Sequence, residues 1–133
     1  MKTLTIKQPF ASLIIEGQKK YEFRTWKTNY RGEILIHAGK STDKKELERL
    51  KSLNLNTENG AIIGKVTITD CILVDKDFQK KLKKENELVY EKMINKDLTE
   101  EKIYAFKLEN VKKIVPIKVN GKLSFWEYDF KDK

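Results

Sequence analysis

The stretch from Gly17 to Gly32 concentrates charged and aromatic side chains. It holds a single carboxylate, Glu22, together with Trp26 and five cations, which are Lys19, Lys20, Arg24, Lys27 and Arg31. Successive side chains of a β-strand alternate between its faces, so Glu22, Arg24 and Trp26 are expected on one face, about 6.6 Å apart. A carboxylate, a guanidinium and an indole can accept a hydrogen bond, donate one and stack, and these contacts hold an unpaired base. The simpler alternative is a surface Glu–Arg pair beside a partly buried tryptophan.

Phosphate contacts are the second element of this hypothesis. Lys7, Lys27 and Arg31 are expected to meet the phosphates of a nucleic acid, while the base enters the site. Gln8 follows Lys7 in the sequence and belongs to the same expected set. The predicted binding residues are therefore Lys7, Gln8, Lys19, Glu22, Arg24, Trp26, Lys27 and Arg31.

The same stretch also permits an enzymatic interpretation. Lys19 can act as a nucleophile or general base if burial and neighbouring cations lower its pKa, and Glu22 can relay protons. Asp70 is a further candidate acid, because it has the strand parity of Ile68 and Ile72 and is expected to be buried or at a strand bend. A turn-capping aspartate is the alternative for Asp70.

Whether the Lys19 side chain can join the site depends on where the strand begins. If strand geometry already held at Lys19, its side chain would share a face with Tyr21 and Phe23, which are predicted to be core residues. We therefore expect the strand to begin after Lys19. Gly17 makes this easy, because glycine frees the chain direction just before the lysine.

Soft metal ligands and thiols are scarce. The chain has one cysteine, Cys71, and one histidine, His37, which excludes an internal disulfide and leaves too few soft ligands for a zinc site. Cys71 is expected to be a small buried thiol and His37 a structural residue. We predict no cofactor and no metal, a carboxylate-bound Mg²⁺ being the remaining alternative.

Length and charge point to one basic domain. The chain has 133 residues and a net charge of +8, and residues 1–40 hold eight cations and three acids. A chain of this length can bury one core, so we expect a single domain over residues 1–133. An excess of cations favours polyanionic partners. Because no apolar run approaches the roughly 18 residues of a membrane span, we expect a cytoplasmic protein without membrane contact.

Strand patterns dominate both ends of the chain, and helical patterns lie between them. Strands are predicted at 2–7, 21–26, 33–38, 61–74, 102–119 and 122–130, and helices at 9–16, 43–53 and 76–96. Gly17 is placed to end the first helix in a left-handed conformation, and Gly64 indicates a bulge. Asp43 and Glu46 have the spacing of a capping box. This order predicts an α+β fold in which a mixed sheet closes on itself, with helices packed outside.

The residues Gly17, Lys19, Glu22 and Arg24 spell G-x-K-x-x-E-x-R, which resembles the signature of the ASCH family, a branch of the PUA-like β-barrels. Blocks before and after it resemble the family as well, namely "LTIKQPFASLIIEG", "TWKTNYRGEILIHA", "GAIIGKVTITDCI" and "KLSFWEYDF". The resemblance covers most of the chain and implies a small mixed β-barrel with helices outside, a cleft beside the signature and a role in nucleic-acid metabolism. One branch hydrolyses an acylated cytidine with lysine, threonine and glutamate; that lysine falls on Lys19, but the threonine falls on Glu22.

These observations lead to three functional hypotheses. The first is a binding module for RNA, another single-stranded nucleic acid or a nucleotide, with a basic cleft at the G-x-K-x-x-E-x-R motif. The second is an amidohydrolase-like or ribonuclease-like enzyme that uses Lys19 and Glu22. The third is a protein-interaction domain whose basic face meets an acidic partner.

Overall fold

Alternating apolar residues build one mixed sheet in the computed structural model, which describes residues 1–131. Within that range the sheet has six strands in the order β2-β5-β4-β3-β1-β6. They are β1 (Lys2–Gln8), β2 (Tyr21–Arg24), β3 (Gly32–Thr42), β4 (Ala61–Leu73), β5 (Tyr104–Lys118) and β6 (Phe125–Glu127). β1 pairs with β3 in parallel, and the other pairs are antiparallel. The predicted α+β class is confirmed, and every predicted strand is present.

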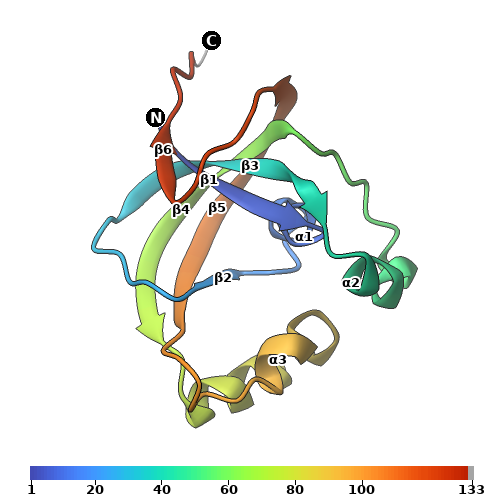
Figure 1. Ribbon diagram of the computed structural model, residues 1–133, viewed down its shortest axis with the longest axis vertical. Helices are drawn as coiled ribbons and strands as arrows, with labels where there is room; N and C mark the ends of the chain where they lie inside the picture. Colours follow the sequence, from blue (N-terminus) through green and yellow to red (C-terminus); the bar gives the residue numbers. More distant parts are fainter. Residues whose placement is uncertain (132–133) are drawn as a thin grey trace.

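The sheet curves strongly but does not close into a barrel (Figure 1), so the prediction of a sheet closing on itself is wrong in that respect. The two edge strands are too short to meet: β2 has four residues and β6 three. β6 pairs only with Lys2, Thr3 and Leu4, which leaves the second half of β1 without a partner on that side. A side chain spans this opening, since Arg24 of β2 donates a hydrogen bond from Nη2 to the Thr5 carbonyl of β1 at 2.8 Å. We call this opening the seam.

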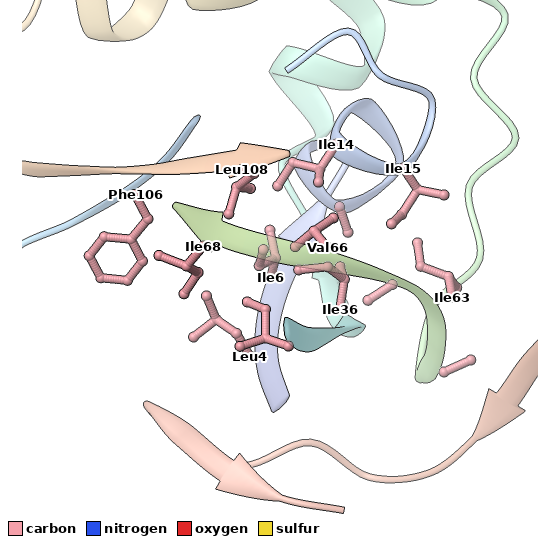
Figure 2. Packing of buried hydrophobic residues seen from close by; sticks show 14 residues of the cluster. Leu4, Ile6, Ile14, Ile15, Ile36, Ile63, Val66, Ile68, Phe106 and Leu108 are labelled. Atoms are coloured by element: carbon pink, nitrogen blue, oxygen red, sulfur yellow. The ribbon is translucent and has the colours of Figure 1, made fainter. Parts of the chain in front are cut away.

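The main core lies on the concave face of the sheet, where Leu4, Ile6, Ile36, Ile68 and Phe106 pack together (Figure 2). Helix α1 (Phe10–Ile15) adds Ile14 and Ile15 to the same cluster, so it packs into the core rather than merely outside the sheet. Gly17 follows the helix with a φ of 80°, as predicted.

A second core holds the remaining helices. It joins β2 and β5 to α2 (Lys44–Arg49), the short 3₁₀-helix η1 (Lys51–Leu53) and α3 (Lys76–Ile94) through buried residues such as Tyr21, Leu50, Leu82 and Tyr90. The Asp43 carboxylate caps α2 by accepting a hydrogen bond from the Glu46 amide at 3.1 Å. The Glu46 carboxylate binds Arg49 instead of returning to Asp43, so only half of the predicted capping box forms.

Two local irregularities shape the molecule. The register of β4 on β5 shifts between Ile62 and Gly64, which confirms the predicted bulge. Asn86 has non-helical backbone angles and divides α3 into two parts, and its side chain accepts a hydrogen bond from the Val89 amide at 3.1 Å. The second part of α3 lies near β2 (Figure 1). No helix in the described part of the chain combines the length and apolarity needed to cross a bilayer.

Candidate functional site

β2 is an edge strand of the sheet, so one of its two edges faces the seam and β1 rather than a paired strand. The Lys20 carbonyl accepts a hydrogen bond from the Leu108 amide of β5 at 2.9 Å. In an antiparallel ladder the N–H and C=O groups of every second residue then point toward the same neighbouring strand. The peptide groups of Glu22 and Arg24 therefore point toward β5, and those of Tyr21 and Phe23 point away from it. The Tyr21 carbonyl is occupied by the Lys19 ammonium at 2.6 Å. The N–H and C=O groups of Phe23 are thus directed toward the seam.

A cleft of about 570 Å³ lies along this seam. Its walls are Thr5, Ile6 and Lys7 of β1 and the chain from Glu22 to Trp26. Phe10 of α1, Asp43, Lys92 and Met93 of the second part of α3, and Glu101 and Ile103 before β5 complete it. The cleft therefore combines a free strand edge with aromatic, apolar and charged side chains.

Lys19, Glu22 and Arg24 form a continuous ionic cluster at the inner wall of the cleft. Glu22 Oε1 lies 3.0 Å from Lys19 Nζ, and Glu22 Oε2 lies 2.9 Å from Arg24 Nη2. Lys19 and Glu22 are buried, while Arg24 is partly exposed. β2 begins at Tyr21, as expected, and Lys19 turns inward before it to reach the carboxylate. Of these three residues only Glu22 and Arg24 line the cleft, so Arg24 is the cation that this wall presents to a ligand.

Burial and pairing act against each other on the pKa values of this cluster. Burial lowers the pKa of Lys19 below its usual value, and the nearby Glu22 carboxylate offsets only part of the effect. Burial alone would raise the pKa of Glu22, but the charges and hydrogen bonds of Lys19 and Arg24 hold it below its usual value. Glu22 is therefore an ionised carboxylate saturated by two cations, not a free acceptor for a ligand.

A smaller pocket of about 190 Å³ lies behind the cleft and reaches Lys19. The residues that line both spaces form the partition between them, and they are Phe10, Glu22, Phe23, Lys92 and Met93. Lys19 Nζ lies 4.9 Å from the Phe23 ring centroid and so faces the aromatic ring as well as Glu22. This arrangement buries an amine beside a carboxylate at the end of a narrow space.

Trp26 lines the cleft but is also part of the core. Its ring lies 5.2 Å from that of Phe106 and 5.3 Å from that of Phe125, in edge-to-face geometry. β2 ends at Arg24, so Trp26 lies beyond the regular strand although it reaches the same cleft. The indole is partly exposed, so it lines the cleft while it packs against the core.

The predicted phosphate contacts are placed unevenly. Lys7 is exposed and lines the cleft, whereas Lys27 and Arg31 are exposed outside its walls. Arg31 also donates hydrogen bonds to the carbonyls of Thr28 and Tyr30. Gln8 is fully buried, and its amide binds Ser12 and the Glu58 carbonyl, so Gln8 holds the fold and has no surface for a ligand.

Asp70 does not join the cluster. It is exposed, lies where the β4 register shifts, and accepts a hydrogen bond from the Cys71 amide at 2.8 Å. The expectation of burial is wrong, whereas the strand bend expected as the other possibility is present, and Asp70 caps no turn because it lies within β4. Its carboxylate also lies 3.9 Å from Arg31 Nη2. Cys71 is only partly buried against the main core. His37 is buried and bound to Thr5 and to the Val119 carbonyl, which is a structural role.

The walls of the cleft include residues that were not predicted as site residues, among them Phe10, Lys92, Met93 and Glu101. Phe10 reads as one of the apolar positions of α1, and Lys92 belongs to a strongly charged helix, so neither carries a local signal of a site. The hydrogen bond of Lys92 to Asp43 at 3.3 Å links α3 to the start of α2 beside the cleft. Among residues 1–131, no group of three or more His, Cys, Asp or Glu side chains is arranged to hold a metal ion.

Comparison with known proteins gives a consistent result. The family model described as ASCH domain matches residues 4–118. Activating signal cointegrator 1 of Mus musculus is 30% identical over 145 aligned positions, which cover 96% of this chain and 22% of that protein. The chain therefore spans much less than the whole of that relative.

Solved structures agree at the level of the fold. The crystal structure of ASCH from Zymomonas mobilis has a TM-score of 0.53 and 19% identity, covering 88% of this chain and 72% of that chain. A point mutant of the same protein has the same TM-score and identity, with 89% and 73% covered. At this identity the likeness concerns the fold alone.

Proposed function

This chain belongs to the ASCH domain family of the PUA-like superfamily, and we propose that it binds single-stranded RNA by taking one unpaired nucleotide into the seam cleft. The resemblance of the G-x-K-x-x-E-x-R motif to that family is thereby confirmed. The family is linked to RNA binding and to enzymes that act on RNA. The observation that carries the proposal is the free edge of β2 beside the Arg24 guanidinium and an aromatic wall.

The contacts available in the cleft match those of an unpaired nucleotide. The Phe23 peptide offers one donor and one acceptor, which can read the edge of a base. The rings of Phe10, Phe23 and Trp26 offer faces or edges for stacking. Lys7 and Arg24 supply cations for the phosphate, while Glu22 is already neutralised within its cluster.

Pairing state decides whether a base can enter such a cleft. A base in a duplex is stacked on both sides and its pairing edge is occupied, whereas an unpaired base can be splayed out and inserted. The protein should therefore prefer single strands over duplexes of the same sequence. The phosphate part of the affinity should fall as salt rises.

Fluorescence anisotropy with a labelled, unstructured RNA and its duplex tests this proposal at several salt concentrations. Lys7→Ala should flatten the salt slope for the single strand by about 0.7 unit, the value for one lost contact. Lys80→Ala is the matched control, because Lys80 is exposed on α3 and does not line the cleft. Equal affinity for both forms of RNA, or equal effects of the two substitutions, would count against the cleft. A single-stranded DNA of the same sequence separates recognition of the ribose from recognition of the base.

A second candidate function is hydrolysis of a modified nucleoside or of RNA. It is favoured by the small pocket that leads to Lys19, an amine whose pKa is lowered by burial and which touches Glu22. Incubation with acylated cytidine and a panel of RNAs, followed by mass spectrometry, detects turnover. Activity that Lys19→Met abolishes would favour the enzyme, and absence of any product with intact binding would favour the binding module.

A further inference from the structure

A second hollow lies next to the seam cleft, on the other side of Thr5. It has a volume of about 320 Å³ and is formed by Lys40 at the end of β3 and by the loop after β5, with Asn120, Lys122 and Leu123. Thr5 lines both this hollow and the seam cleft. The two spaces therefore adjoin along β1.

The loop that forms this hollow is fixed against the sheet. A Cβ atom on Gly121 would lie 2.5 Å from Thr5 Oγ1 and 2.7 Å from the His37 ring, so only glycine allows this close approach. The loop is tied at both ends. Before Gly121, the Val119 carbonyl lies 2.6 Å from His37 Nε2, and after it, Trp126 Nε1 donates to Thr5 Oγ1 at 3.0 Å. The wall of the hollow is thus held in place before any ligand arrives.

The charges of the hollow suit an anion. Lys40 and Lys122 are exposed, and neither forms an ion pair within the described part of the chain. No carboxylate lines the hollow, in contrast to the seam cleft, where Glu22, Asp43 and Glu101 are present. Leu123 is 94% exposed and offers an apolar surface beside the two cations.

We propose that this hollow is a second subsite, which binds the nucleotide next to the one in the seam cleft on the same RNA strand. Lys40 and Lys122 hold its phosphate, and Leu123 packs against its sugar or base. The proposal rests on the proposed function of the cleft and adds that the footprint extends past Thr5 toward the loop after β5. A single nucleotide then fills the cleft alone, and a longer strand fills both spaces.

The test compares a mononucleotide with a five-nucleotide single-stranded RNA by isothermal titration calorimetry and anisotropy. The double variant Lys40→Ala/Lys122→Ala should weaken binding of the longer RNA and flatten its salt slope by about 0.7 unit, the value for one lost phosphate contact. Its affinity for the mononucleotide should remain that of the wild type. The matched control is Lys80→Ala/Lys84→Ala, which removes the same charge from exposed positions of α3.

The outcomes separate the subsite from the cleft. If the Lys40/Lys122 variant behaves as the control while Lys7→Ala still weakens binding, the subsite is refuted and the cleft stands. If the Lys40/Lys122 variant also weakens mononucleotide binding equally, the two spaces are not separate subsites, and this proposal fails. Absence of RNA binding by the wild type would overturn both proposals.

Discussion

Replacing Glu22 by glutamine removes the one negative charge that joins two cations in the inner wall of the cleft. The carboxylate lies 3.0 Å from Lys19 Nζ and 2.9 Å from Arg24 Nη2. With an effective dielectric constant of about 20, each contact gives roughly 5.5 kcal/mol of attraction before desolvation. The cost of burying the ions, several kcal/mol each, cancels much of this gain. Loss of the charge nevertheless leaves a buried amine and a guanidinium without compensation.

We expect Glu22→Gln to lower the free energy of unfolding by about 3–5 kcal/mol, the range for breaking a buried pair from one side. That is a large part of the roughly 5–15 kcal/mol that holds an average domain together. Lys19→Met should cost clearly less, because burial already disfavours the charged amine and Glu22 keeps Arg24 as its partner. The opposite order of these two substitutions would refute our account of the cluster.

Urea denaturation followed by circular dichroism measures these differences at constant m-value. The control is Glu48→Gln, whose carboxylate pairs with Lys51 at 2.9 Å while both side chains are 74% exposed. Such a surface pair contributes about 1 kcal/mol or less, so the control should stay close to the wild type. A Glu22→Gln protein within about 0.5 kcal/mol of the wild type would also contradict the argument.

Three further predictions concern pH, stacking and packing. The folded-state pKa of Glu22 lies below its usual 4.5, so its ionisation stabilises the fold above about pH 4.5, and this contribution is lost as pH falls through the lower value. Urea midpoints measured from pH 7 to pH 3 should therefore fall, and Glu22→Gln should make this pH dependence weaker. Trp26→Ala should weaken RNA binding by about 1–3 kcal/mol and also lower the thermal midpoint, because the indole lines the cleft and packs against Phe106 in the core. Unchanged affinity of the folded variant would exclude stacking on Trp26. Phe106→Ala should cost about 3–5 kcal/mol in urea denaturation, because Phe106 is fully buried in the main core and its ring packs against those of Trp26 and Phe125. A cost below about 1 kcal/mol would contradict the packing described.

Much of the fold follows from local patterns. The period of apolar residues predicts each strand and helix, because that period decides which face can be buried. Gly17 and Gly64 mark a helix end and a bulge, since both features depend on the backbone of one residue. Closure of the sheet depends instead on how many residues the distant strands β2 and β6 contribute, and no local pattern gives that length.

The site was predicted only in part for the same reason. Alternation correctly placed Glu22 and Arg24 on one face, but it did not reveal that Lys19 saturates the carboxylate from a turn before the strand. Lys92 enters the cleft from a helix far along the chain, so only tertiary packing brings it there. Gln8 and Asp70 were predicted as site residues because of their polar side chains, but these side chains form hydrogen bonds with nearby residues of the fold instead.

The most direct test of the seam cleft is an NMR titration of ¹⁵N-labelled protein with a short unstructured RNA. We expect the backbone amide of Phe23, the indole N–H of Trp26 and the amides of β1 around Thr5 to shift most and to saturate together. Shifts confined to the exposed outer half of β5, at residues 111–118, would contradict it, as would a spectrum that RNA leaves unchanged.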